Sequence, residues 1–482
     1  MEGIYRETVE LKQARLSGDG KRTIIEGAPG AKIVIKGSDV ATGWEPRPDG
    51  VFVKRNWRHN SQQVFVDGAP LRQIGGFLST AYSNSTLPPV APAPNVGVWP
   101  GRIAGDETNM AVGDFHYDAS AKNLYIKPGG ETLDGKTVEV SVRTHLVFGT
   151  GLANVTLRNL AFQHSNSSAA GRSGAVVMFG NDLTLENLSV TWTDSLGINL
   201  TGDNNVLKDS VANHNGQTGV VARGKNVKLT NNETSYNNTR GFNKFWEAGG
   251  IKCIGPGGSS PSGLLDSVIE RHKAFYNNGG GIWLDSDNRN VVIRDSEVAY
   301  NDGDGIHYEI SYTGTIAGNY VFGNRLRGIY LSNAVATTVE HNIVVANQLD
   351  GIAVNSERSS NPKYAAVNNK IIGNIVAWNG KTELRLPPKD IASISTENLF
   401  VGARAPMFGV WQKPFYPMVS GLSNWIEMSG QDKNSWQKIM PCPPALEAKI
   451  EKRETDLDWP MLTSIARQLD IAAAARRPGP HN

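Results

Sequence analysis

The chain has 482 residues, which is enough for two or three ordinary domains or for one large repeat architecture. Its 48 lysine and arginine residues nearly balance 46 aspartate and glutamate residues, which argues against a nucleic-acid partner, and no stretch is apolar for long enough to span a bilayer. Only two cysteines are present, so a disulfide framework is excluded, and the 52 glycines favour turns over helices.

The first part of the chain contains two kinds of sequence. Residues 1–45 hold short alternating runs between glycine-rich turns, which are typical of strands. Residues 46–145 break that rhythm with runs such as Gln63-Val-Phe-Val-Asp-Gly68, and they predict an inserted, β-sandwich-like subdomain of antiparallel strands. No signal peptide is visible at Met1. Because the start is abrupt, we expect a secreted or periplasmic protein whose leader is missing from the present chain; a cytoplasmic protein is the alternative.

A repeat runs from about residue 146 to about residue 385. A glycine opens each short apolar run: Gly174, Gly197, Gly219, Gly250, Gly281, Gly305, Gly328 and Gly351. The intervals between these glycines are 23, 22, 31, 31, 24, 23 and 23 residues, and in five cases an asparagine precedes the glycine by four residues. Such a period, with short strands and no helix between them, is typical of a parallel β-helix, in which stacked coils share one core. We therefore predict an all-β, right-handed parallel β-helix over residues 146–385, with residues 1–45 as its N-terminal coils.

The repeat assigns the strand residues to two faces, because side chains alternate along a strand. From Gly197 onward the position after the glycine is always β-branched and is predicted to point inward: Ile198, Val220, Ile251, Ile282, Ile306, Ile329 and Ile352. The second and fourth positions then point outward, and they include Lys252, Trp283, His307 and Tyr330, and Arg223, Asp285, Glu309 and Ser332. Cys253 falls at an inward position, so we interpret it as an inert core residue and not as a reactive thiol.

Two long loops and a C-terminal segment depart from the repeat. The extra residues 239–248 and 255–263 flank the coil that Gly250 opens. Long loops on a solenoid usually lie around its functional site. We expect them to form walls beside Asp285. Residues 386–482 lose the repeat, and we interpret them as a C-terminal cap with one amphipathic helix over residues 457–476.

The pair Asp285 and Glu309 is the strongest candidate for chemistry. The two residues occupy the same outward column one coil apart, and stacked strands lie about 4.8 Å apart. A retaining glycosidase needs its two carboxyl groups about 5–5.5 Å apart, whereas an inverting enzyme needs about 6.5–9.5 Å. The coil pitch therefore favours a retaining mechanism. A solvated surface pair or a calcium site is the plainer alternative.

Further residues are expected to hold a sugar near this pair. An outward tryptophan offers a face on which sugars stack, although it could simply pack beneath a loop. A histidine in the same position one coil later could bind a hydroxyl or only contact a loop. The predicted substrate-binding residues are Trp283, His307, Lys252, Asp287, Trp246, Glu247 and Arg223. Of these, Asp287 is also the main rival of Asp285 as nucleophile.

The segment Gly281-Ile-Trp-Leu-Asp285, followed by Gly305-Ile-His-Tyr-Glu309, resembles the active-site pair of the β-helical β-xylosidases of glycoside hydrolase family 120. The resemblance implies a nucleophile at Asp285 and an acid/base at Glu309. It also suits the insertion at residues 46–145, since that family interrupts its helix with a β-sandwich. Two departures concern the choice of sugar: Ser286 follows the aspartate where an aromatic residue is expected, and Ser311-Tyr312 stand where Asn-His is expected.

Two functions of other classes remain open. A polysaccharide lyase would need a basic residue and a calcium ion, held by Asp285, Asp287 and Glu309, to neutralise a uronate. Its base would come from Lys252, Arg223, Lys244 or Arg271. A non-catalytic carbohydrate-binding surface protein would need neither. In each case the expected partner is a carbohydrate, not a nucleic acid or a membrane. The glycosidase mechanism demands no cofactor, and the sequence does not predict an oligomeric state.

Overall fold

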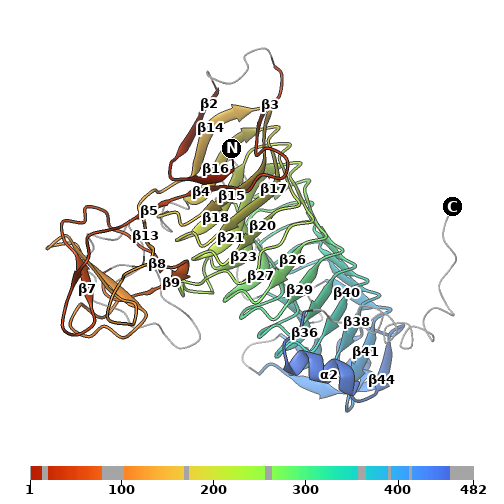
Figure 1. Cartoon of the computed structure of the whole chain (residues 1–482). Helices are drawn as coiled ribbons and strands as arrows, with labels where there is room; N and C mark the ends of the chain where they lie inside the picture. The colour runs from red at the N-terminus through yellow and green to blue at the C-terminus, as the bar shows by residue number, and fades with distance from the viewer. Residues whose placement is uncertain are drawn as a thin grey trace. The chain divides into compact units, whose positions relative to one another are not determined.

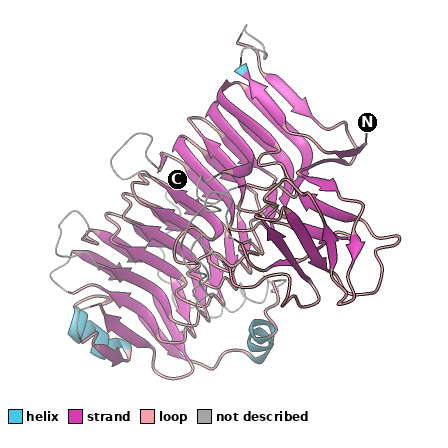
Figure 2. Ribbon diagram, turned by 90° about the vertical axis from the view of Figure 1, so that its left-hand side faces the viewer, coloured by secondary structure: helices cyan, strands magenta, loops and turns pink. Residues whose placement is uncertain are grey.

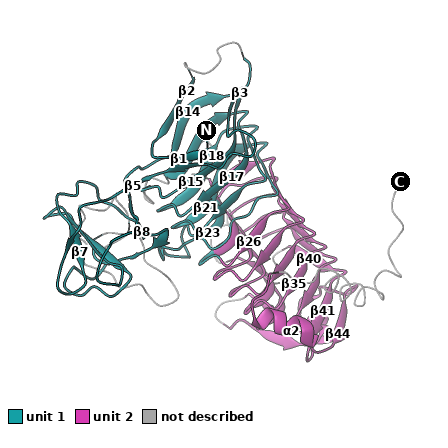
Figure 3. Ribbon diagram, viewed as in Figure 1, with its two compact units in different colours: residues 1–252, 277–279 teal, residues 253–276, 280–482 magenta. Residues whose placement is uncertain are grey.

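The structure is a computed structural model that describes residues 2–13, 20–76, 78, 103–167, 173–255, 263–356, 365–388, 392–411 and 415–455. These residues form mostly short strands, with two short helices near the end (Figure 2). The chain divides into two compact units (Figure 3). Unit 1 comprises Met1–Lys252 and Asn277–Gly279, and unit 2 comprises Cys253–Tyr276 and Gly280–Asn482.

In unit 1, short parallel strands stack one above another as the coils of a β-helix (Figure 1). These strands are β1 (Gly3–Tyr5), β2 (Val9–Lys12), β3 (Thr23–Glu26), β4 (Ile33–Lys36), β14 (Val147–Ala153), β15 (Val155–Gln163), β16 (Gly174–Asn181), β17 (Thr184–Thr191), β18 (Leu196–Thr201), β19 (Val206–Lys208), β20 (Val211–Asn213), β21 (Thr218–Lys225), β22 (Lys228–Thr230) and the first four residues of β23 (Gly249–Ile254), whose last two residues belong to unit 2.

The coils of unit 1 keep their register through the inward column. Ile198 pairs with Val220, and Val220 pairs with Ile251, and each of these side chains is at most 1% exposed. One glycine of the repeat departs from this register, because Gly174 pairs with Leu196 and not with the next glycine. The β-branched column therefore forms the core that the sequence predicts.

The segment from β5 to β13 forms the inserted β-subdomain of unit 1. One sheet contains β6 (Glu45–Pro46), β7 (Phe52–Lys54), β10 (Arg72–Gln73), β11 (Asp114–Asp118) and β12 (Asn123–Lys127), and the other contains β5 (Ser38–Val40), β8 (Val64–Val66), β9 (Ala69–Pro70) and β13 (Val138–Ser141). Pairing is antiparallel except between β10 and β11. Phe52, Phe115 and Leu124 of the first sheet share one core with Val64 and Val140 of the second. The subdomain is thus a small sandwich.

A buried histidine lies between this subdomain and the β-helix coils of unit 1. The ring of His164 stacks on Phe65 with 3.7 Å between ring centroids, and its Nδ1 lies 3.0 Å from the hydroxyl of Ser38. Burial lowers the pKa of His164 to about 3, and the charge of Lys36 acts in the same direction. The nearby carboxylate of Glu139 opposes this shift. The histidine is therefore neutral in the folded protein at neutral pH.

We expect this histidine to make the protein less stable in acid. The unfolded chain takes up a proton at His164 below about pH 6.5, whereas the folded chain does so only near pH 3. Stability therefore falls as the pH drops from 6.5 to 3, by on the order of 2–4 kcal/mol from this group. Thermal melts at pH 7 and pH 4 check this, with His164→Gln as the comparison. The account is wrong if the variant loses as much stability between the two pH values as the parent protein.

Unit 2 contains further coils and the C-terminal elements. Its strands and helices are β24 (Leu264–Leu265), β25 (Val268–Glu270), β26 (Lys273–Phe275), β27 (Gly280–Asp285), β28 (Val292–Arg294), β29 (Glu297–Ala299), β30 (Ile306–Glu309), β31 (Thr315–Ala317), β32 (Tyr320–Phe322), β33 (Ile329–Ser332), β34 (Thr338–Glu340), β35 (Ile343–Val345), β36 (Asp350–Asn355), β37 (Asn369–Ile372), β38 (Ile375–Ala377), β39 (Thr382–Leu386), β40 (Ser393–Thr396), β41 (Leu399–Gly402), β42 (Met407–Val410), β43 (Met418–Ser420), α1 (Leu422–Ser429), β44 (Trp436–Ile439) and α2 (Pro444–Glu451). Cys253 is fully buried in this unit.

Each glycine that opens a coil in unit 2 lies against the asparagine of the next coil. A Cβ atom on Gly281 would come within 2.8 Å of Asn301 Nδ2, and one on Gly305 would come within 2.8 Å of Asn324 Nδ2. The asparagines form a ladder, in which Asn301 Nδ2 donates to Asn324 Oδ1 and Asn324 Nδ2 donates to Asn347 Oδ1, both at 2.9 Å. Any larger residue at the glycine would displace this ladder, which explains the paired spacing of glycine and asparagine in the sequence.

Removing one rung of the ladder is expected to destabilise unit 2. In Asn324→Ala, the carbonyl oxygen of Val298 and the backbone N–H of Asn301 both lose a buried partner. Leaving two buried groups unpaired costs about 2–4 kcal/mol. Chemical denaturation measures the change, and Asn424→Ala on the exposed surface of α1 serves as the control, with an expected change below about 0.5 kcal/mol. Equal effects of the two substitutions would contradict a structural role for the ladder.

The C-terminal part of unit 2 packs two short helices near its last strands. Trp425 of α1 is fully buried, and its Nε1 donates to Asp432 Oδ2 at 2.8 Å. Leu446 of α2 joins a core cluster with Leu399 and Val401 of β41. The helix predicted over residues 457–476 lies outside the described residues.

Candidate active site

The two acids of the predicted pair lie on neighbouring strands of unit 2. β27 and β30 pair in parallel, and their register sets Asp285 directly beside Glu309. The residues before them alternate, so that Leu284 and Tyr308 are fully buried in the core while the acids stay partly exposed. Because adjacent strands lie about 4.8 Å apart, two carboxylates at one register position can act on the two sides of a single bond.

The two acids accept hydrogen bonds from different neighbouring side chains. Trp283 Nε1 donates to Glu309 Oε2 at 3.1 Å, and Ser286 Oγ donates to Asp285 Oδ1 at 2.9 Å. The ring of His307 also approaches Glu309, with Nε2 at 3.8 Å from Oε2. Different donors therefore surround the two carboxylates, which gives them the unlike environments that distinct catalytic roles require.

A stack of rings in the column of Trp283 orients the indole toward Glu309. Trp283 stacks on His307 with 4.9 Å between centroids and an interplanar angle of 14°, and His307 contacts Tyr330 at 4.6 Å. All three side chains are less than 10% exposed although they point away from the β-helix core. The stack covers one face of Trp283, so part of this ring is a packing surface and not a free platform.

A chain of alternating charges continues from His307 to later coils of unit 2. His307 Nδ1 lies 3.7 Å from Asp304 Oδ2, and Asp304 accepts a hydrogen bond from Arg327 Nη1 at 3.2 Å. Arg327 then faces Asp350 at 3.8 Å, and Asp350 accepts a bond from Arg385 Nη2 at 3.1 Å. Burial raises the pKa of Asp304, whereas the guanidinium of Arg327 opposes that shift.

Sequence reasoning did not find this charged chain. A signal is nevertheless present, because Asp304, Arg327 and Asp350 each directly precede a repeat glycine. Arg327 also lies 4.0 Å above the ring of Tyr330, so the charges and the rings pack together. Through these contacts, the position of His307 beside Glu309 depends on residues two coils away.

Asp287 points to a different partner. Its Oδ1 accepts hydrogen bonds from Arg289 Nε and Nη2 at 3.1 and 2.7 Å. Within the described part of the chain, no three histidine, cysteine or acidic side chains group closely enough to hold a metal ion. Among the described residues, Asp285, Asp287 and Glu309 are therefore not gathered into one such group, and the calcium of the lyase alternative stays a prediction.

The remaining predicted site residues belong to unit 1. Lys252 and Glu247 are buried, Trp246 and Arg223 are half-buried, and the carbonyl oxygen of Glu247 accepts a hydrogen bond from the hydroxyl of Thr218. The acid pair belongs to unit 2, so contact between these residues and the acids stays a prediction.

The second predicted wall, residues 255–263, is described only at its two ends. There, the backbone N–H of Gly255 donates to the carbonyl oxygen of Asp285 at 3.1 Å. The loop therefore begins next to the acid pair.

The family model described as "right handed beta helix region" matches residues 116–258 and 243–386. The chain belongs to this family. No curated protein sequence matches the chain of this β-helix protein. None of the described helices is long and apolar enough to cross a membrane.

Among solved structures, the β-helix protein is similar to XylC in its complex with xylose, with 13% identity over 90% of this chain and 76% of that chain and a TM-score of 0.51. A structure described as a glycoside hydrolase has 10% identity over 90% of this chain and 88% of its own, with a TM-score of 0.45. A mutant of the periplasmic alginate epimerase AlgG has 18% identity over 49% and 58%, with a TM-score of 0.40. At these identities the likeness to XylC concerns the fold alone.

Proposed function

We propose that this β-helix protein is a retaining glycoside hydrolase, with Asp285 as the nucleophile and Glu309 as the acid/base. The observation that carries the proposal is the register of β27 and β30, which sets the two carboxylates beside each other one coil apart. The strand spacing of about 4.8 Å falls near the separation of a retaining pair and below that of an inverting pair, about 6.5–9.5 Å.

The reaction follows from these positions in two displacements. In the first, a carboxylate oxygen of Asp285 attacks the anomeric carbon, the glycosidic bond breaks, and Glu309 gives its proton to the departing oxygen. In the second, Glu309 takes a proton from water, the resulting hydroxide attacks the same carbon, and the ester to Asp285 breaks. Trp283 and His307 position Glu309 through the contacts described above, and no cofactor takes part.

The substrate class is a carbohydrate, and the motif resemblance makes a β-xyloside the first candidate. At the positions that depart from the family motif, the side chains bind other residues of this chain. Ser286, which stands where an aromatic residue is expected, donates to Asp285, and the ring of Tyr312 lies 5.1 Å from the guanidinium of Arg289. We therefore propose hydrolysis of a β-glycoside as the activity, with the sugar to be determined by assay. A location outside the cytoplasm remains part of the proposal.

A substrate screen separates this proposal from the two other functions. Aryl glycosides and plant or bacterial polysaccharides are incubated with the protein, and both new reducing ends and ultraviolet absorbance are followed. A hydrolase raises reducing ends without an absorbing product, whereas a lyase produces an unsaturated end that absorbs. The proposal is overturned if ultraviolet absorbance rises in proportion to the new reducing ends. Binding of a carbohydrate without turnover of any substrate would favour a non-catalytic carbohydrate-binding protein.

A further inference from the structure

A cavity of about 540 Å³ lies within unit 1, between the β-subdomain and the turn that joins β17 to β18. Its size falls in the range of small-molecule sites, about 300–1,000 Å³. From the subdomain side it is lined by Gln62, Gln63, Gln73 and several apolar residues, and from the β-helix side by Trp192, Thr239 and Arg240. Arg240 comes from the loop after β22, which the sequence singled out as an extra segment. None of these residues belongs to the proposed catalytic pair.

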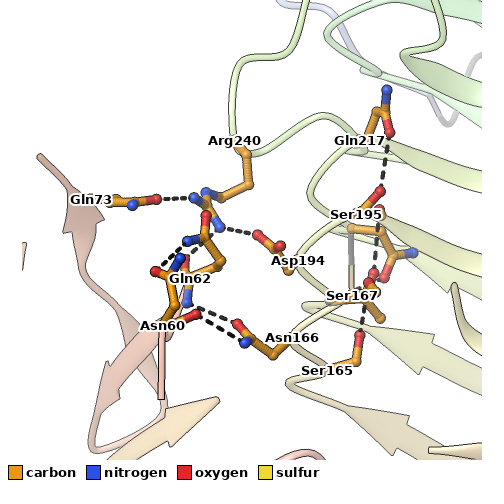
Figure 4. A network of polar contacts seen from close by, with 12 residues as sticks. Asn60, Gln62, Gln73, Ser165, Asn166, Ser167, Asp194, Ser195, Gln217 and Arg240 are labelled. Carbon is orange, nitrogen blue, oxygen red and sulfur yellow. Dashed lines mark hydrogen bonds and ion pairs between the residues drawn. The ribbon is translucent and has the colours of Figure 1, made fainter. Parts of the chain in front are cut away.

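The two cations that line the cavity are already neutralised. The guanidinium of Arg240 donates to the carboxylate of Asp194, to the side-chain oxygen of Gln73 and to the backbone oxygen of Gln62 (Figure 4). Arg72 donates to Asp114 through two nitrogens, at 2.8 and 3.1 Å. An anionic ligand would therefore find no open positive charge, and a cationic ligand would meet the arginines. The cavity is suited to a neutral ligand.

Two residues that line the cavity, Gln62 and Gln63, carry buried side-chain oxygens that have no hydrogen-bond donor. Gln62 Nε2 donates to Asn60 Oδ1 at 3.1 Å, which fixes the orientation of the carboxamide and leaves its oxygen open. The side-chain oxygens of Gln62 and Gln63 are buried without a hydrogen-bond partner, and the two residues are 0% and 5% exposed. A buried acceptor without a donor destabilises the fold, so a ligand that brings hydroxyl donors would relieve that cost.

An aromatic ring and apolar side chains complete the lining. One face of Trp192 stacks on His214 with 4.9 Å between centroids, and His214 stacks on Tyr236 at 4.8 Å. These two rings support one face of the indole, and the indole itself lines the cavity together with Ile74 and Leu78. A braced aromatic side chain is a rigid surface for the apolar face of a sugar ring. Hydroxyl acceptors beside such a surface are what a neutral sugar needs.

We propose that this cavity binds one neutral sugar ring of a carbohydrate chain, with its hydroxyls donating to Gln62 and Gln63 and its apolar face against Trp192. The site lies apart from the acids that we assign to hydrolysis, and it does not require that they catalyse any reaction. It gives the inserted β-subdomain a function, since most of the lining comes from that insertion.

Isothermal titration tests the proposal in the Asp285→Ala protein, in which substrate turnover cannot obscure binding. D-xylose, D-glucose and D-glucuronate are titrated into this protein and into the same protein carrying Trp192→Ala or the near-isosteric Gln63→Met. We expect one of the neutral sugars to bind, glucuronate to bind at least ten-fold more weakly, and the substitutions to weaken binding at least ten-fold for Trp192→Ala and about three- to ten-fold for Gln63→Met.

A Lys228→Ala variant on the exposed face of β22 is the control, with unchanged binding expected. Circular dichroism establishes that each variant is folded, and Gln63→Met carries the test if Trp192→Ala is not. The proposal is overturned if no neutral sugar binds, if glucuronate binds as tightly as the neutral sugar that binds best, or if folded cavity variants bind as the parent does.

Discussion

Replacing Asp285 with alanine or asparagine is expected to lower kcat on every substrate by about 10⁴-fold or more, because the step that forms the covalent intermediate loses its nucleophile. The fold should persist, since the side chain of Asp285 is partly exposed and stands at the end of β27, outside the buried core of the coil. Steady-state kinetics on an aryl glycoside measures the loss, and a thermal melt establishes that the variant is folded.

Asp287→Asn is the matched comparison for this substitution. Asp287 lies two residues further along the chain and holds Arg289, with a backbone φ of 62° that asparagine tolerates well. We expect its replacement to lower kcat by less than about ten-fold, because it removes no reacting group. A larger loss in Asp287→Asn than in Asp285→Asn would transfer the role of nucleophile to Asp287.

Replacing Glu309 with alanine is expected to affect substrates according to their leaving groups. With a poor leaving group, such as a sugar hydroxyl, the rate should fall by about 10²–10⁴-fold, because the departing oxygen receives no proton. With a good leaving group, such as a dinitrophenolate, the first displacement needs no acid and should be nearly unaffected. The second displacement still lacks its base, so the glycosyl-enzyme should accumulate, and added azide should restore turnover.

Glu340→Ala provides the control for this variant. Glu340 lies on β34, in the same unit but not in the column of the acids, and we expect its removal to leave the dependence on leaving group unchanged. If Glu309→Ala remains fully active on substrates with poor leaving groups, the assignment of Glu309 as acid/base is wrong.

The β-helix could be predicted from the sequence because its repeat has a local physical cause. Gly305 must lack a side chain to make room for Asn324 of the next coil, so five windings carry the same two residues at the same spacing. The inward Ile306 then follows from alternation along the strand. The spacing of Asp285 and Glu309 equals one winding, and for that reason their common register on β27 and β30 could also be predicted.

The charged chain behind the acids could not be predicted in the same way. Asp304 and Arg327 precede the strand residues whose side chains alternate regularly between the two faces. Their pairing depends on the geometry of the turns, which the period of the repeat does not predict. Trp411 lies outside the repeat, yet the guanidinium of Arg327 lies 5.6 Å from its ring centroid. Contacts of this kind become visible only when the coils are assembled in three dimensions.

The cavity of unit 1 was beyond sequence reasoning for a related reason. Arg240 and Gln62 are 178 residues apart and meet only because the β-subdomain folds back onto the coils. The sequence indicated an insertion and an extra loop, but it carried no signal that the two would line one space. The asparagine four residues before the glycine, in contrast, recurs in five windings, so its spacing was visible in the sequence.

The configuration of the first sugar product tests the central claim most directly, namely that one winding of the β-helix places two acids at the separation of a retaining pair. Proton NMR follows the anomeric signal of the released sugar in the first minutes, before mutarotation mixes the anomers. We expect a product with the same anomeric configuration as the substrate. A first product of inverted configuration would contradict the account, because it requires a water molecule between carboxylates about 6.5–9.5 Å apart.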